Sequence, residues 1–153
     1  TIFNNITLFN DNISESQVWD SIDQVGARRF IEALPNKLNF NVKERGASLS
    51  VGQRQLISCI RIMLYDPKII LLDEATSSVD SETESMIQSA ISKILKNRTS
   101  IVVAHRLSTI KEVDNIIVLE NGEIKEIGDH NSLNKSGGYY RRLYEMQNKN
   151  ILI

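Results

Sequence analysis

The sequence predicts an α/β fold in which helices flank a buried parallel sheet. Two short apolar segments, residues 68–72 and 100–104, lack the alternation of apolar and polar residues that marks a half-exposed strand. Residues 82–95, which lie between them, repeat apolar side chains at helical spacing. Short apolar strands separated by a helix are typical of a parallel sheet that is covered on both faces.

The first third of the chain predicts short helices and loops. Ser14 is followed by apolar residues at helical spacing, which indicates a capped amphipathic helix. A second helix is expected to end before residues 36–48, which we expect to form a loop. Ser50, with Gln53 three positions later, matches a capping box, so a long helix should begin there and stop at Pro67.

The last third predicts a short helix over residues 107–112 and a β-hairpin over residues 115–127 with a tight Asn-Gly turn. Residues 139–146 have the pattern of a closing amphipathic helix. His130 falls in a polar stretch, where we expect a solvated loop. Trp19 and the tyrosines near the end of the chain are expected to pack rather than to stack on a ligand.

The composition excludes several classes of protein. The chain has 153 residues, of which 41% are hydrophobic and 24% charged, which is the balance of a globular domain and excludes disorder. The net charge of −1 gives no indication of binding to nucleic acid or to an acidic membrane. Cys59 is the only cysteine, so no internal disulfide forms, which fits a reducing compartment.

No apolar run approaches the roughly 20 residues that span a bilayer. The chain begins at Thr1, without a Met and without the basic start of a signal peptide. We therefore expect a piece of a longer protein.

Acidic and imidazole side chains follow the two predicted strands. Asp73 and Glu74 come directly after residues 68–72, and His105 follows residues 100–104. Parallel sheets bind ligands beyond the carboxyl ends of their strands. An acid there can hold Mg²⁺, a second acid can take a proton from water, and a histidine can contact a phosphate oxygen.

Each of these side chains also has a plainer interpretation. Asp73 and Glu74 can be solvated acids where a strand leaves the core, and a single histidine at a strand end is more often structural. Their position at a common sheet edge favours a site.

The predicted helix start at Ser50 is a third candidate. With Val51, Gly52 and Gln53 it offers a hydroxyl, free backbone N–H groups and the positive end of a helix dipole, all of which suit phosphate. An ordinary helix cap explains the same residues, and taken alone that interpretation is the stronger. The sequence does not decide whether Arg54 is a surface charge or pairs with an acid.

Four segments together resemble the ATPases of the ABC family. Residues 49–55 (Leu49-Ser50-Val51-Gly52-Gln53-Arg54-Gln55) resemble the signature motif, and residues 69–74 resemble the Walker B strand. Residues 77–80 look like the D-loop, and residues 104–106 look like the switch-histidine loop. The segments have the family's order and spacing. More weakly, residues 1–6 and 138–147 are similar to parts of exporter-type members.

The resemblance implies a fold and a division of the chain. It implies part of a P-loop NTPase (RecA-like) core, with flanking helices on a parallel sheet, and part of the ABC helical signature subdomain. Residues 1–66 would belong to the helical subdomain that carries the signature motif. Residues 67–153 would form the C-terminal half of the ATPase core.

The resemblance also implies roles for single residues. Asp73 would help to hold Mg²⁺, mainly through water, and Glu74 would orient and deprotonate the attacking water. His105 would contact the γ-phosphate of ATP. Ser50 and Gly52, with Val51 and Gln53 beside them, would reach the γ-phosphate of ATP held by the opposite subunit. Asp80 would link the two sites across the dimer.

By the same resemblance, the cofactors are ATP and Mg²⁺, both expected only in the complete dimeric protein. The partners are a second ATP-binding domain, arranged head to tail, and the transmembrane domains of a transporter, with no nucleic acid. The complete protein would lie at the cytoplasmic face of the cell membrane, and this fragment would be soluble.

The sequence departs from the family pattern in two ways. Val51 stands where the commonest signature has Gly, although Val keeps the backbone N–H. No Gly-x-x-x-x-Gly-Lys-Ser/Thr loop occurs, because none of the seven glycines is followed by Lys. We therefore expect this chain alone to have no meaningful ATPase activity. We also expect the apolar edges of strands 68–72 and 100–104 to cause self-association.

The leading interpretation is the ATPase motor of an exporter-type transporter. One alternative is a non-transport ABC ATPase that acts in DNA repair or translation, but residues 119–122 and 139–147 look more like transporters, and no basic patch occurs. Another is a binding module that kept the fold and lost catalysis. The presence of both Glu74 and His105 argues against that.

Overall fold

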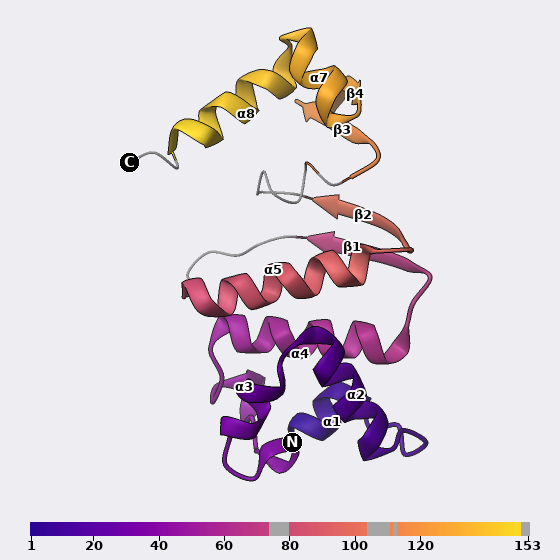
Figure 1. The fold of residues 1–153 in the computed structure, drawn as a ribbon, viewed down its shortest axis with the longest axis vertical. Helices are drawn as coiled ribbons and strands as arrows, with labels where there is room; N and C mark the ends of the chain where they lie inside the picture. Colours follow the sequence, from indigo (N-terminus) through magenta and orange to yellow (C-terminus); the bar gives the residue numbers. More distant parts are fainter. Residues whose placement is uncertain (74–79, 104–110, 112, 151–153) are drawn as a thin grey trace. The chain divides into compact units, whose positions relative to one another are not determined.

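The computed structural model describes residues 1–73, 80–103, 111 and 113–150 (Figure 1). Its contacts divide the chain into two compact units, Thr1–Val102 and Val103–Ile153. The predicted boundary between residues 66 and 67 separates two subdomains that the family resemblance implies, whereas the boundary after Val102 separates two groups of contacts. The first boundary stays a prediction. Among the described helices, none combines the length and the apolar character that crossing a bilayer requires.

The first unit begins with three short helices: α1 (Ile2–Thr7), α2 (Glu15–Val25) and α3 (Arg28–Ala33). The predicted cap of α2 is confirmed. The Ser14 side chain accepts a hydrogen bond from the Gln17 backbone N–H at 3.3 Å, and Gln17 Oε1 accepts from the Ser14 N–H at 2.8 Å. The segment predicted as a loop holds two single turns of 3₁₀ helix, η1 (Lys37–Asn39) and η2 (Glu44–Gly46).

Helix α4 (Val51–Tyr65) begins and ends where the sequence predicts. Ser50 caps its start. At its end Asp66 adopts a left-handed backbone (φ 43°) immediately before Pro67, which cannot continue a helix. The residues of α4 that face the core are Leu56, Ile57, Cys59 and Ile60, together with Gly52.

Helix α4 also holds α1 in place through its polar side chains. The Arg61 guanidinium donates to the Asn5 carbonyl through Nε and Nη2, at 3.0 and 2.7 Å. The Tyr65 hydroxyl donates to the Thr7 carbonyl at 2.6 Å. Both carbonyls lie in the last turn of α1, where helix carbonyls have no partner within the helix. Arg61 therefore donates to a backbone carbonyl of α1.

One core joins the helices of the first unit. Its fully buried side chains come from α1, α2, α3 and α4, and α5 adds a further apolar face. Burying an aliphatic side chain of this size stabilises the fold by about 1.5–3 kcal/mol. The largest of them are Ile2, Ile6, Val18, Ile22, Ile31, Leu56 and Ile60.

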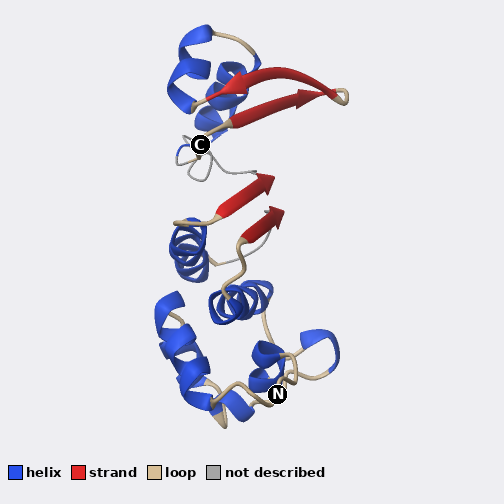
Figure 2. Cartoon of the chain, turned by 90° about the vertical axis from the view of Figure 1, so that its right-hand side faces the viewer, coloured by secondary structure: helices blue, strands red, loops and turns tan. Residues whose placement is uncertain are grey.

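Strand β1 (Ile69–Asp73), helix α5 (Ser81–Leu95) and strand β2 (Thr99–Val103) follow one another in the chain. The two strands are hydrogen-bonded neighbours, and their arrows point the same way in both views (Figures 1 and 2). The helix α5 that connects them buries Ile87, Ala90, Ile91 and Ile94. The predicted α/β class, with parallel strands and flanking helices, is confirmed.

The prediction that the sheet is covered on both faces is wrong for the described residues. Along both strands exposed and more buried side chains alternate, and Ile69, Leu71, Ile101 and Val103 are between 55% and 75% exposed. An unbroken apolar run indicates two covered faces. The described residues cover one, so the second apolar face lies open.

The second unit contains the predicted hairpin. Strands β3 (Ile116–Glu120) and β4 (Glu123–Gly128) pair antiparallel. Asn121 (φ 52°) and Gly122 (φ 78°) turn the chain, both with the positive φ that a tight type I′ turn requires. The register shifts between Val118 and Leu119, which is a β-bulge.

Helix α7 (His130–Ser136) was not predicted, and it corrects the expectation of a solvated loop at His130. Asp129 caps α7, because its carboxylate accepts from the N–H groups of Asn131 and Ser132. His130 is half-buried, with Nδ1 2.6 Å from the Tyr140 hydroxyl. Leu133 is the one buried residue of α7, so no apolar stripe signalled the helix.

Helix α8 (Tyr139–Asn150) confirms the predicted closing helix. Its Tyr140 is buried and stacks on Tyr144, with ring centroids 6.1 Å apart. Tyr140 and Tyr144 therefore pack, as predicted. The helix predicted over residues 107–112 falls largely outside the described residues.

Candidate functional site

The start of α4 is the best-defined part of the candidate site. Ser50 Oγ accepts from the Gln53 N–H at 3.1 Å, and Gln53 Oε1 accepts from the Ser50 N–H at 3.0 Å. This reciprocal pair is the capping box that the sequence predicts. Ser50 and Gln53 are therefore fixed relative to each other before any ligand arrives.

The capping box leaves donors for a ligand. In the described structure the N–H groups of Val51 and Gly52 have no protein acceptor, because the first turn of a helix lacks carbonyls for them. Ser50 and Val51 are exposed, whereas Gly52 is buried. The accessible donors are therefore the Ser50 hydroxyl and the first-turn backbone at Val51, at the positive end of the helix dipole.

Asp80 is the N-cap of α5. Its Oδ1 accepts from the Thr83 N–H at 2.9 Å. The hydrogen bonds from the backbone and the side chain of Thr83 lower the pKa of the Asp80 carboxyl, so it stays ionised at neutral pH. The structure thus shows a capping role for Asp80, and its predicted role across a dimer stays a prediction.

The starts of α4 and α5 border the same hollow. Gln53 from α4 and Glu82 and Thr83 from α5 line a cavity of about 710 Å³, with Leu56 and Met86 among its apolar residues. Residues adjacent to Ser50 and to Asp80 therefore lie in one region of the first unit. No residue pattern predicts this neighbourhood, because the two segments are about 30 residues apart in the chain.

Asp73 is the last residue of β1, at the carboxyl end of the strand, and it is exposed. This is the position that the sequence predicts. Glu74 and His105 lie outside the described residues, as do residues 77–79 of the predicted D-loop. Within the described ranges, no three His, Cys, Asp or Glu side chains gather into a group that could hold a metal.

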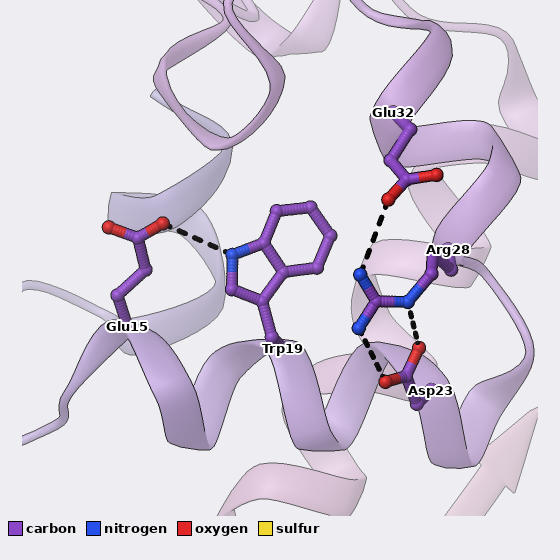
Figure 3. A network of polar contacts seen from close by, with 5 residues as sticks. All are labelled: Glu15, Trp19, Asp23, Arg28 and Glu32. Atoms are coloured by element: carbon purple, nitrogen blue, oxygen red, sulfur yellow. Dashed lines mark hydrogen bonds and ion pairs between the residues drawn. The ribbon is translucent and has the colours of Figure 1, made fainter.

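A second polar cluster joins α2 to α3 (Figure 3). Arg28 pairs with Asp23 through Nε and Nη2, both at 2.6 Å, and with Glu32 at 3.2 Å. Its guanidinium lies 4.9 Å from the centre of the Trp19 ring, whose Nε1 donates to Glu15 at 3.1 Å.

The hydrogen bond from Arg28 lowers the pKa of the Asp23 carboxyl. Trp19 also packs against the hydrophobic core, which confirms its predicted packing role. This cluster explains how α2 and α3 are joined, and the two ion pairs are exposed enough to contribute little stability.

The fold and the capped helix start define a class: an α/β domain in which parallel strands join a helical segment whose capped start offers first-turn N–H donors. The family model described as "ABC transporter" matches residues 1–77, which is half of the chain. The chain belongs to the ABC transporter family.

Curated relatives give the same result over nearly the whole chain. A probable multidrug resistance ABC transporter ATP-binding/permease protein of Bacillus subtilis (YheH) is 44% identical over 147 residues, which cover 96% of this chain and 22% of that protein. An ATP-dependent lipid A-core flippase of Shewanella oneidensis is also 44% identical, over 93% of this chain and 26% of its own length.

A solved structure of a bacterial Atm1-family ABC exporter with ATP bound has a TM-score of 0.82 and 37% identity to this chain. The match covers 96% of this chain and 26% of that one. The chain therefore spans about a quarter of the length of each of these three proteins.

Proposed function

We propose that this chain is part of the ATP-binding and ATP-hydrolysing motor of an ABC exporter, in which it supplies the signature side of a shared site. The observation that carries the proposal is the start of α4. There a capping box presents the Ser50 hydroxyl and free first-turn N–H groups within a segment that resembles the signature motif. Relatives named as ATP-binding/permease proteins support it.

The residues present fit the ligands that this function needs. An exposed hydroxyl and unpaired N–H groups at a helix start suit an anionic phosphate, and an exposed carboxylate at a strand end, Asp73, suits Mg²⁺. When bound, Mg²⁺ would neutralise charge on the phosphates. Glu74 would orient and deprotonate the attacking water, and His105 would contact the γ-phosphate.

The same proposal includes partners. The signature side of one domain would face ATP held by a second ATP-binding domain arranged head to tail, with Asp80 linking the two sites. Transmembrane domains would couple ATP hydrolysis to transport at the cytoplasmic face of the membrane. No glycine-rich phosphate loop occurs in these 153 residues. We therefore propose that this chain alone does not turn over ATP.

The test uses the complete polypeptide that contains this segment, reconstituted in lipid vesicles. Glu74→Gln should lower the steady-state rate of ATP hydrolysis by roughly 10²-fold or more, because a general base contributes about that much. Glu120→Gln is the matched control, since Glu120 is also an acid at a strand end, and it should leave the rate unchanged. Equal rates in the two variants would refute the catalytic assignment.

A further inference from the structure

The loop that leads into α4 has an unusual backbone. Lys43 (φ 58°), Arg45 (φ 54°) and Gly46 (φ 72°) all lie in the left-handed region, which side chains other than glycine adopt rarely. Such a conformation persists only where surrounding contacts impose it. Some of the contacts that hold this loop backbone come from α4 itself.

Arg54, in the first turns of α4, reaches back over this loop. Its Nη1 donates to the Leu49 carbonyl at 2.7 Å and lies 3.3 Å from the Gly46 carbonyl. The Arg54 stem also lies close to Gly46 through Cδ and Cγ. A Cβ atom added at Gly46 would lie 2.8 Å from Arg54 Cδ. The loop therefore lies directly on the Arg54 side chain.

The bond to Leu49 bears on the candidate site. The Leu49 carbonyl and the Ser50 N–H belong to the same peptide unit, and Gln53 Oε1 accepts from that N–H at 3.0 Å. Arg54 thus holds one side of this peptide plane and Gln53 holds the other. Because a peptide unit is planar, fixing both sides fixes the position of the Ser50 Cα. The Ser50 hydroxyl is held in turn by the bond that it accepts from the Gln53 N–H.

The positive charge of Arg54 lies near the N-terminus of α4, where it is expected to destabilise the helix. A cation near a helix N-terminus opposes the helix dipole, which favours anions there. The same positive charge adds to the dipole's attraction for a phosphate. Arg54 makes two hydrogen bonds to backbone carbonyls and would attract an incoming anion. Both effects explain why an arginine occupies this position despite its cost to the helix.

We propose that Arg54 is a positioning residue for the phosphate-contacting start of α4. It holds the Leu49–Ser50 peptide in the orientation that presents the Ser50 hydroxyl, and it strengthens the positive field there. The positioning of the peptide rests on the hydrogen bonds alone. The effect on phosphate rests on the proposed function.

The first test measures the geometry in this chain. Amide hydrogen exchange at Ser50 and at residues 44–49 should be roughly tenfold faster in Arg54→Met, because the protecting contacts are lost. Arg142→Met, which removes an exposed arginine from α8, should leave the exchange rates unchanged. Unchanged exchange in Arg54→Met would overturn the proposal. If that variant does not fold, Arg54→Lys, which keeps the charge and the stem, should show a smaller increase.

The second test measures the purpose in the complete polypeptide. Arg54→Met should lower kcat for ATP about tenfold while the Kd for ATP, measured on separated domains, is unchanged, because the signature side acts on the partner's nucleotide. Arg54→Lys should recover part of kcat. A normal kcat in Arg54→Met would overturn the positioning role. Absence of turnover in the unmodified polypeptide would instead refute the proposed function.

Discussion

The Ser50 side chain has two roles: it caps α4, and it is a candidate contact to phosphate. Both use the same oxygen, which accepts from Gln53 as a cap and would donate to a phosphate oxygen. A hydroxyl can do both at once, whereas a carboxylate can only accept. Two substitutions can therefore separate the roles.

We predict that Ser50→Ala lowers the free energy of unfolding by about 1 kcal/mol, the usual cost of losing an N-cap. Ser50→Asp should keep the stability, because Asp also caps helices, but should abolish ATP turnover in the complete polypeptide, because its negative charge repels phosphate. Urea denaturation and steady-state hydrolysis measure the two effects. Full activity in Ser50→Asp would show that Ser50 does not face phosphate.

Asp80 gives a second prediction at this scale. Its pKa is below the ordinary 3.8 in the folded chain, because Thr83 hydrogen bonds favour the ionised form. A carboxyl with a lowered folded pKa stabilises the fold above its unfolded pKa and loses that contribution as pH falls through the folded value. The melting temperature should therefore decrease as the pH is lowered below about 4. In Asp80→Asn this decrease with pH should be smaller. An identical pH profile for Asp80→Asn would contradict this.

At the scale of elements, local chemistry decides what can be predicted. The caps at Ser14 and Ser50 and the Asn121-Gly122 turn each depend on residues a few positions apart, so the sequence predicts them and the structure confirms them. Helix α7 depends on one cap and one buried leucine, which is too weak a pattern. The Arg54 contacts depend on a loop backbone that no residue pattern specifies.

The hairpin turn gives a prediction at this scale. Gly122→Ala should destabilise the second unit by about 1 kcal/mol, because φ is 78° and a side chain disfavours that backbone. A Cβ at Gly122 would meet no atom within 4 Å, so steric contact with neighbours adds nothing. Asn121→Gly is the control and should be tolerated. Thermal melting compares the two, and equal melting temperatures would refute the turn assignment.

At the scale of the whole molecule, the strands carry more apolar surface than the described residues cover. The open face of β1 and β2 includes Ile69, Leu71, Ile101 and Val103. The sequence could predict that these strands are apolar, but not which face would lack a cover, because burial depends on residues elsewhere in a protein. Large exposed apolar patches usually mark an interface.

We therefore predict that the isolated chain self-associates at micromolar concentration. Light scattering should show a mass above the 17.4 kDa of a single chain, and Leu71→Lys should shift the population toward the monomer. Lys135→Leu on α7 is a control that adds an apolar residue elsewhere. A monomer of unmodified chain at all concentrations would contradict the prediction.

We propose that these residues form the signature side of a shared ATP site and lack the loop that binds the nucleotide's phosphates. Calorimetric titration of Mg-ATP into the 153-residue chain tests it most directly. We predict no binding at nucleotide concentrations on the order of millimolar, because one helix start and one strand-end acid hold phosphate weakly without that loop. Clear one-to-one binding would contradict it, since the chain would then contain a complete phosphate site.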